Sequence, residues 1–211
     1  MIIETQTIKP KDFPLLIEFD RIHLIEVMSE LGIEASRCPP VLTNDELLSA
    51  YNKQDILLWL LVNKEIVGYL WREKRPNCLF GMGAAIKKEF YGLGLSEYFI
   101  KLTEQIAKEH ALQYCQLAVI PQNGRVISTY MKHGYKIVKT VPAYLGAEYP
   151  DTFRCIMEKN LSETTSNLKT VNRCTVSALD DEQLTQLTNN GYVGTCFIKG
   201  TNQIVFELMF Q

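Results

Sequence analysis

The chain has 211 residues, of which 46% are hydrophobic, so it can bury one good core and hold a second small module beside it. Its 22 Lys and Arg residues nearly balance its 24 Asp and Glu residues, which leaves a formal net charge of -2. Because no basic field gathers phosphate backbones, we do not expect nucleic acid to be a partner.

Cysteine and histidine spacing indicates neither a disulfide framework nor a metal site. The six cysteines form no C-x-x-C pair, so we expect reduced, buried thiols, and the three histidines lack metal-ligand spacing. The N-terminus has no basic segment followed by an apolar stretch, and no run approaches the ~20 apolar residues of a membrane span. We therefore expect a cytoplasmic protein, while delivery by an unfamiliar signal stays open.

The first half of the chain alternates between helical and strand periodicity. Apolar residues from Leu16 to Leu31 follow helical spacing, and Thr43 with Glu46 is typical of a capping box. Two apolar runs separated by Asn63-Lys64-Glu65 predict a hairpin. The predicted elements are a strand at 2–8, helices at 12–31 and 43–52, and strands at 56–62, 66–71 and 78–87.

The second half contains two more helices and a separate C-terminal pattern. Apolar residues beyond Gly94 recur at helical spacing as far as His110, and Pro121-Gln122-Asn123 opens a helix that Gly134 closes. Strands at 114–120, 135–141 and 152–158 complete a main domain over residues 1–159. A polar linker at 160–167 precedes a βαββ module over 168–211, with its strand at 168–176, helix at 178–189 and hairpin at 192–199 and 203–210.

The C-terminal module is too small to bury its own apolar face. We expect it to dock either on the main domain or on a second copy of the chain, which would make a homodimer.

A strand runs into a glycine-bearing loop and then a helix at residues 84–96. Backbone amides in the loop and the first helical turn point at one spot, where the helix dipole adds about half a positive charge. This geometry favours an anion such as phosphate, although turn requirements alone also explain the glycines. Glu97 stands where a Rossmann fingerprint has its third glycine, and no Gly-Lys-Ser/Thr of a P-loop follows.

A second motif lies about 30 residues downstream. Asn123 and Tyr130 are seven residues apart, two helical turns, so both project from one helix face, and Lys132, Gly134 and Tyr135 follow. These residues resemble the GNAT superfamily pattern N-x-x-A-x-x-x-Y-x-K-x-G-F/Y, preceded by its R/Q-x-x-G-x-G/A loop. The resemblance covers about residues 1–159. It implies an α/β fold with a mixed, mostly antiparallel sheet of about six or seven strands and helices on both faces.

The resemblance also implies an enzyme, an N-acetyltransferase that moves an acetyl group from acetyl-CoA to an amine by direct transfer without a metal. Tyr130 would protonate the departing thiolate, which suits a phenol within hydrogen-bond reach. Asn123 would bond the pantetheine or its linker region. The implied backbone contacts are to the pantetheine arm from Ala84, Ala85 and Ile86, and to the pyrophosphate from Gly92, Leu93, Gly94, Leu95 and Ser96.

The sequence departs from the family pattern at several positions. Tyr91 replaces the first Arg or Gln of the loop, Ser96 its last Gly or Ala, and Val126 the helix alanine. Ala118 stands where one GNAT group, which acetylates ribosomal-protein N-termini, has a glutamate. The catalytic base is therefore unassigned, and the candidates are Glu73, Glu148, Asp151 and a water chain.

Plainer interpretations stay open beside these. Tyr130 could pack the helix against the sheet, and Asn123 could cap its helix. Acidic residues on the two early helices, which flank the acceptor groove in this family, are typical of a solvated face but could attract a cationic amine. They are Glu18, Asp20, Glu26, Glu30, Glu34, Asp45 and Glu46.

Two functional alternatives also remain. The chain could be a catalytically weak CoA-binding or protein-interaction module, which the missing carboxylates and Tyr91 favour. The C-terminal module could instead complete the acceptor site for a protein substrate.

Overall fold

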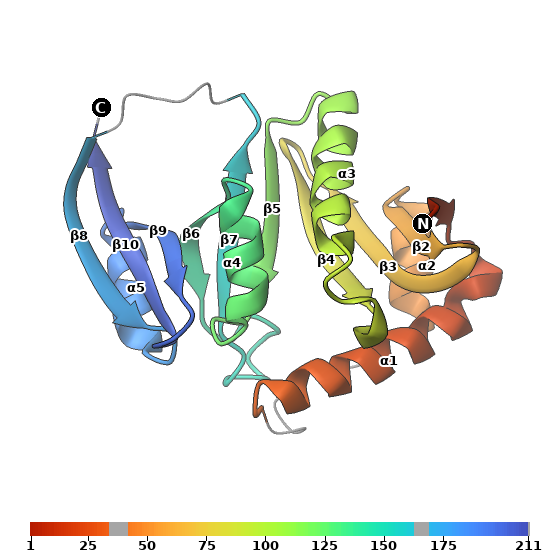
Figure 1. The fold of residues 1–211 in the computed structure, drawn as a ribbon, viewed down its shortest axis with the longest axis horizontal. Coiled ribbons are helices and arrows are strands. Elements are labelled where there is room, and N and C mark those ends of the chain that lie inside the picture. Colours follow the sequence, from red (N-terminus) through yellow and green to blue (C-terminus); the bar gives the residue numbers. More distant parts are fainter. Residues whose placement is uncertain (34–41, 163–168, 211) are drawn as a thin grey trace. The chain divides into compact units, whose positions relative to one another are not determined.

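The computed structural model describes residues 1–33, 42–162 and 169–210 (Figure 1). The chain divides into two compact units, Met1–Gln105 and Ile106–Gln211. The fold is α/β, with mostly antiparallel strands flanked by five α-helices in the described ranges, which confirms the predicted class. The sequence instead predicts a linker at residues 160–167 between a main domain and a C-terminal module, and that division stays a prediction.

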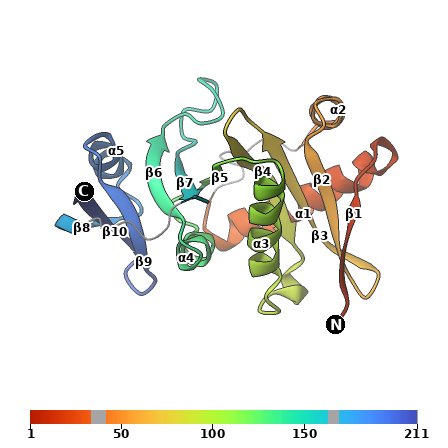
Figure 2. The ribbon, with the colours of Figure 1, turned by 90° about the horizontal axis from the view of Figure 1, so that it is seen from above.

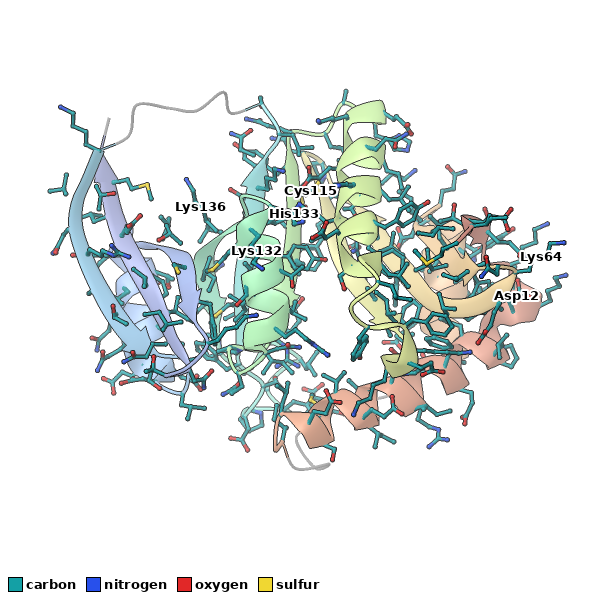
Figure 3. The ribbon with its side chains drawn as sticks, in the orientation of Figure 1. Asp12, Lys64, Cys115, Lys132, His133 and Lys136 are labelled. Carbon is teal, nitrogen blue, oxygen red and sulfur yellow. The ribbon has the colours of Figure 1, made fainter. Side chains whose placement is uncertain are left out.

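Four strands form the sheet of the first unit. They are β1 (Ile3–Thr7), β2 (Ile56–Val62), β3 (Glu65–Lys74) and β4 (Cys78–Ile86), each antiparallel to the next. The predicted hairpin is β2 and β3, and Asn63 and Lys64 turn it with φ of 49° and 72°. Figure 3 labels Lys64 of this turn. The strand boundaries agree with the sequence prediction to within three residues.

Helices cover both faces of this sheet. A short 3-10 turn, η1 (Pro10–Asp12), leads into α1 (Phe13–Glu30), and the predicted capping box starts α2 (Asn44–Asn52), where Glu46 N–H donates to Thr43 Oγ1 at 3.2 Å. Another 3-10 turn, η3 (Lys88–Phe90), precedes α3 (Leu95–Glu109), which runs to the unit boundary and beyond. Figure 2 shows α2 and α3 on opposite sides of β2, β3 and β4.

Alternation along the strands produces two apolar clusters. The cluster beneath α1 and α2 contains Ile8, Phe13, Leu16, Phe19, Leu47, Ala50, Leu57, Trp59, Tyr69 and Trp71. The cluster beneath α3 contains Leu60, Val62, Val67, Leu70, Leu95 and Phe99. Because neighbouring residues of a strand face opposite sides, Tyr69 lies in the first cluster and Leu70 in the second.

The second unit has six strands in the order β5-β7-β6-β9-β10-β8. Its strands are β5 (Tyr114–Val119), β6 (Lys136–Val141), β7 (Arg154–Asn160), β8 (Lys169–Ser177), β9 (Val193–Ile198) and β10 (Gln203–Phe210). Its helices are α4 (Gly124–Lys132) and α5 (Asp181–Asn189), on opposite sides of these strands in Figure 2. All the predicted elements of this half are present.

The C-terminal strands extend the sheet of the second unit beyond β6. β9 pairs antiparallel with β6 through Gly194 and Ile137, and β10 and β8 follow outward. An ideal Cβ on Gly194 would lie 3.0 Å from Ile137 Cβ, so the small residue allows the close pairing. In the structure, the C-terminal strands thus pair with a strand of the same chain, which is one of the two predicted alternatives. The homodimer stays a prediction.

Three details differ from the sequence prediction. α5 begins at Asp181 instead of 178, because the Asp180 carboxylate accepts from Gln183 N–H at 3.0 Å and caps the helix there. β7 extends to Asn160, into the predicted linker, whose residues 163–167 lie outside the described residues. Cys196 is exposed and Cys174 half-buried, contrary to the predicted burial, and Cys174 lies on β8, the outermost strand of this unit.

The other described cysteines behave as expected. Cys78, Cys115 and Cys155 are buried free thiols, and burial raises the pKa of Cys155 to about 12. Cys38 lies outside the described residues. In the same described part of the chain, every helix is too short or too polar to cross a membrane.

Candidate active site

The loop after β4 has an open backbone that glycine makes accessible. Gly92 and Gly94 have φ of +80° and +78°, a left-handed conformation that favours glycine. No described atom lies within 4 Å of where a Cβ would stand on either residue. Gly92, Leu93 and Gly94 are exposed, so a ligand can approach the main chain of this loop directly.

The first turn of α3 adds further donors. Its first helical hydrogen bond runs from Tyr98 N–H to the Gly94 carbonyl at 3.0 Å, so the amides of residues 95–97 precede the helical ladder. Leu95 is 1% exposed and anchors this turn in the apolar cluster, whereas Ser96 is exposed. An anchored helix N-terminus, with amides outside the helical ladder and a partial positive charge, suits a phosphate group.

β4 contains a bulge just before the residues predicted to hold the pantetheine arm. Trp71 of β3 pairs with Gly83 and Arg72 pairs with Gly81, which leaves Met82 as the extra residue. Beyond the bulge, Ala84, Ala85 and Ile86 pair in register with residues 70, 69 and 68. The strands approach closely there, because a Cβ on Gly68 would lie 2.6 Å from the Ala85 carbonyl oxygen.

A buried arginine holds the bulge. Arg72 is 3% exposed and donates from Nη1 to the Gly83 carbonyl at 3.1 Å and to the Trp71 carbonyl at 2.9 Å. Its Nε donates to Thr103 Oγ1 of α3 at 3.1 Å. Charged hydrogen bonds of this kind are among the stronger ones, so the backbone at Gly83 is fixed from beneath.

A phenol and a carboxylate meet on the opposite face of the bulge. Tyr69 is 2% exposed, donates to the carboxylate of Asp20 on α1, and fills the space beside Gly83, where a Cβ would lie 2.9 Å from the phenol oxygen. Burial raises the pKa of Asp20 and raises that of Tyr69 well above its usual value. The phenol is therefore neutral and a donor.

Asn123 occupies the N-cap of α4. Its Oδ1 accepts from Val126 N–H at 3.2 Å, which is the capping alternative from the sequence. The cap uses the side-chain oxygen as an acceptor, so the side-chain amide nitrogen keeps its capacity to donate hydrogen bonds. At the other end of the helix, Lys132 and His133 follow one another on the last turn (Figure 3).

Tyr130 lies near the C-terminal end of α4 and is half-buried. Its ring meets the buried ring of Tyr135 edge to face, with centroids 4.9 Å apart and an angle of 85°. This contact holds the Tyr130 ring through its carbon atoms, so it does not depend on the Tyr130 hydroxyl.

The family model "Acetyltransferase (GNAT) family" matches residues 24–135, more than half of the chain. The chain belongs to the GNAT acetyltransferase family. No curated protein matches the sequence.

Solved GNAT structures share the fold. The PaiA N-acetyltransferase of Thermoplasma acidophilum, in complex with coenzyme A, is 21% identical with a TM-score of 0.64 over 76% of this chain and 99% of its own. The ribosomal-protein-S18-alanine N-acetyltransferase of Escherichia coli is 12% identical with a TM-score of 0.61, over 79% and 98%. Ard1 of Thermoplasma volcanium is 16% identical with a TM-score of 0.60, over 77% and 100%. About a fifth of this GNAT chain thus has no counterpart in these structures.

None of the base candidates from the sequence is distinguished by its surroundings in this GNAT fold. The Glu73 carboxylate accepts from Arg75 Nε at 2.6 Å, and Arg75 in turn stacks 3.7 Å over the ring of Phe80. Glu148 is exposed and turns its carboxylate toward Gly146, while Asp151 is exposed in the same loop. Their role as base stays a prediction.

The acidic residues of the early helices have mostly local partners. Glu18 pairs with Arg21 at 2.7 Å, Glu26 with His23 at 2.9 Å and Glu30 with Lys88 at 2.6 Å. Glu46 belongs to the capping box of α2, and Glu34 lies outside the described residues. Most of the cluster therefore behaves as a solvated face, and Asp20 differs by its half-buried position.

The Asp20 and Tyr69 pair is the feature that sequence reasoning missed. The sequence contains a signal for it, because Asp20 follows Leu16 by four residues and Phe13 by seven, which places a carboxylate on the apolar face of α1. Carboxylates at such positions are uncommon unless a partner satisfies them.

Proposed function

We propose that this GNAT chain is an N-acetyltransferase that moves an acetyl group from acetyl-CoA to an amine of a small molecule or protein. The amides of residues 92–96 bind the pyrophosphate, and the backbone of residues 84–86 bonds the pantetheine arm as an added strand would. Asn123 contributes its amide nitrogen to the pantetheine. The reduced cysteines favour action in the cytoplasm.

The open loop at Gly92 and Gly94 carries this proposal. Two exposed left-handed glycines and a helix N-terminus anchored by Leu95 bring together several amides outside the helical ladder, and this arrangement suits a dianion. Family membership supports the same ligand, and the PaiA structure contains coenzyme A.

The transfer proceeds by direct attack in a ternary complex. The acceptor nitrogen attacks the thioester carbonyl, a C–N bond forms, the nitrogen loses a proton, and the C–S bond breaks. Tyr130 gives its phenolic proton to the departing thiolate and recovers one from solvent. Because the thiolate is protonated as it leaves, the tetrahedral intermediate collapses toward products.

A CoA-binding module without turnover is the rival function. Ala118 and the absence of Asp or Glu from β4, Cys78–Ile86, favour it. It predicts binding of acetyl-CoA with no thiol release in the presence of any amine.

Thiol release with Tyr130→Phe tests the proposal. The variant retains the ring that packs on Tyr135 and loses only the hydroxyl, so turnover should fall about 100-fold while the Kd for acetyl-CoA stays unchanged. Tyr192→Phe is the matched control, because it removes a hydroxyl that accepts from Asn172 at 2.8 Å in the C-terminal strands. Equal turnover in Tyr130→Phe and wild type would remove Tyr130 from the mechanism.

A further inference from the structure

The Asp20 and Tyr69 pair has no role in the transfer as proposed above. Asp20 is a half-buried carboxylate on α1, and it accepts from the Tyr69 phenol and from the backbone of Leu42. Its partner Tyr69 belongs to an aromatic group, because Phe19 meets Tyr69 edge to face at 6.1 Å and Trp59 at 5.8 Å. An ionised carboxylate in such surroundings is costly, so a functional reason for it is worth seeking.

The direction of the pantetheine arm brings its acyl end to this pair. With the pyrophosphate on the loop that follows β4, an arm bonded to residues 84–86 runs backward along the strand toward its N-terminal end. The step from Ile86 to Met82 covers about 13 Å at the strand rise per residue. The reactive end of the arm therefore reaches the bulge at Met82 and Gly83.

The bulge and the pair are in contact within the first unit. The Tyr69 phenol fills the space where a Cβ of Gly83 would stand, and Arg72 fixes the Gly83 carbonyl at 3.1 Å on the other face. Tyr69 thus joins the carboxylate of α1 to the point of β4 where the acyl group is expected. Met82, the extra residue of the bulge, is 43% exposed.

On this basis, and resting on the proposed function, we propose that Asp20 is the catalytic base of the acetyl transfer and binds the acceptor amine as its ammonium ion. The carboxylate attracts the cation and takes one proton from nitrogen, which frees the lone pair for attack on the thioester carbonyl. After the C–N bond forms, the second nitrogen proton leaves to solvent as the C–S bond breaks, and the thiolate takes its proton from Tyr130. Asp20 returns its own proton to solvent, so the cycle releases one proton overall.

Tyr69 is the positioning residue of this base. Its phenol is held between Gly83 and α1, so its hydrogen bond, together with the one from the Leu42 backbone, sets the orientation of the Asp20 carboxylate. A carboxylate has about four lone-pair sites, so these two bonds leave acceptor capacity for the amine. His23 is also close on α1, but its Nδ1 is engaged by Glu26 at 2.9 Å.

Thiol release from acetyl-CoA tests this assignment with n-butylamine, benzylamine, spermidine and an alanine-initiated peptide as acceptors. Asp20→Asn preserves shape and the acceptor for Tyr69, and kcat/KM for the amine should fall about 100-fold. The Kd for acetyl-CoA should not change. Asp55→Asn is the matched control, because Asp55 likewise is a partly desolvated carboxylate that accepts from an aromatic donor of β3, Trp71 Nε1, at 2.9 Å. It should retain wild-type turnover.

Two further variants guard against a purely structural explanation. Asp20→Ala should recover turnover when formate is added, because formate supplies the missing carboxylate, whereas a misfolded variant would not respond. Tyr69→Phe should raise KM for the amine or lower kcat by about tenfold with the Kd for acetyl-CoA unchanged.

The outcomes distinguish failure of the Asp20 assignment from failure of the proposed acetyltransferase function. Full turnover in Asp20→Asn, or no formate rescue of a folded Asp20→Ala, overturns the assignment while the acetyltransferase itself stands. A wild-type protein that binds acetyl-CoA but releases no thiol with any of the four amines overturns the proposed function and this assignment with it.

Discussion

Ionising the half-buried Asp20 carboxyl beside Tyr69 costs free energy, and this cost can be measured as a change of stability with pH. Burial raises the pKa of Asp20 above its unfolded value of 3.8, although Tyr69 and Leu42 oppose the shift. The stabilising contribution of a group with a raised folded pKa is fully present below the unfolded pKa and is lost as pH rises through the folded pKa.

Asp20→Asn cannot ionise at this position and so does not suffer this loss. The free energy of unfolding of the variant, relative to that of wild type, should therefore increase as pH rises from about 4 to 7. Urea unfolding at several pH values measures the difference. Glu18→Gln should show the opposite sign, because the hydrogen bond from Arg21 lowers the pKa of Glu18. Parallel stability curves for wild type and Asp20→Asn would contradict the account of Asp20. A variant more stable yet less active is the signature of a residue kept for function.

The local geometry of the candidate site could be predicted from sequence where a motif acts over a few neighbouring residues. The amides of residues 92–96 and the cap at Asn123 follow from loop and helix chemistry, which acts over a few neighbouring residues. The pairing of Asp20 with Tyr69 spans 49 residues of sequence, and neither local propensity nor spacing indicates which strand residue faces a given helix residue. The sequence therefore offers Glu73, Glu148, Asp151 and a water chain as candidate bases, and it does not indicate the pairing of Asp20 with Tyr69.

At the scale of elements, the packing of α4 against β9 shows how the C-terminal strands are held. An ideal Cβ on Gly124, the first residue of α4, would lie 2.2 Å from the Phe197 ring. The aromatic side chain thus sits directly on the glycine. Deleting the C-terminal strands would also expose the edge of β6, so a point substitution is the cleaner probe of their attachment.

Gly124→Ala should lower the free energy of unfolding by about 1–3 kcal/mol, because the ring must move to make room for the methyl group. Gly200→Ala is the matched control, since no described atom lies within 4 Å of its Cβ position in the β9–β10 turn. Guanidinium unfolding of both variants checks this. Equal stability of Gly124→Ala and wild type would show that Phe197 does not depend on the glycine.

Secondary structure could be predicted closely because each element has its own periodicity and end signals. Thr43 with Glu46 marks α2, and Asn63 with Lys64 marks the hairpin, as predicted. The bulge at Met82 and the pairing of Gly194 with Ile137 could not be predicted, because register depends on which distant strands meet. The contact of the Tyr69 ring with Gly83 depends on the same register.

At the scale of the whole molecule, a GNAT chain with a net charge of -2 has no strong field to concentrate an anionic cofactor. Under the proposed function, binding of acetyl-CoA therefore comes from local contacts, and we propose that the amides at Gly92, Gly94 and the first turn of α3 make most of them. Tyr91 stands where the family loop has a polar side chain, which places more of the binding on the main chain.

Calorimetric titration of acetyl-CoA into wild type, Gly94→Ala and Gly32→Ala tests this claim most directly. Both glycines have positive φ, +78° and +68°, with open space around the Cβ position, so alanine costs a comparable ~1–2 kcal/mol of backbone strain at each. We predict that wild type and Gly32→Ala bind acetyl-CoA equally and that Gly94→Ala binds about tenfold more weakly, because its loop amides are displaced. Equal Kd values for all three proteins, or no binding by wild type, would contradict the account.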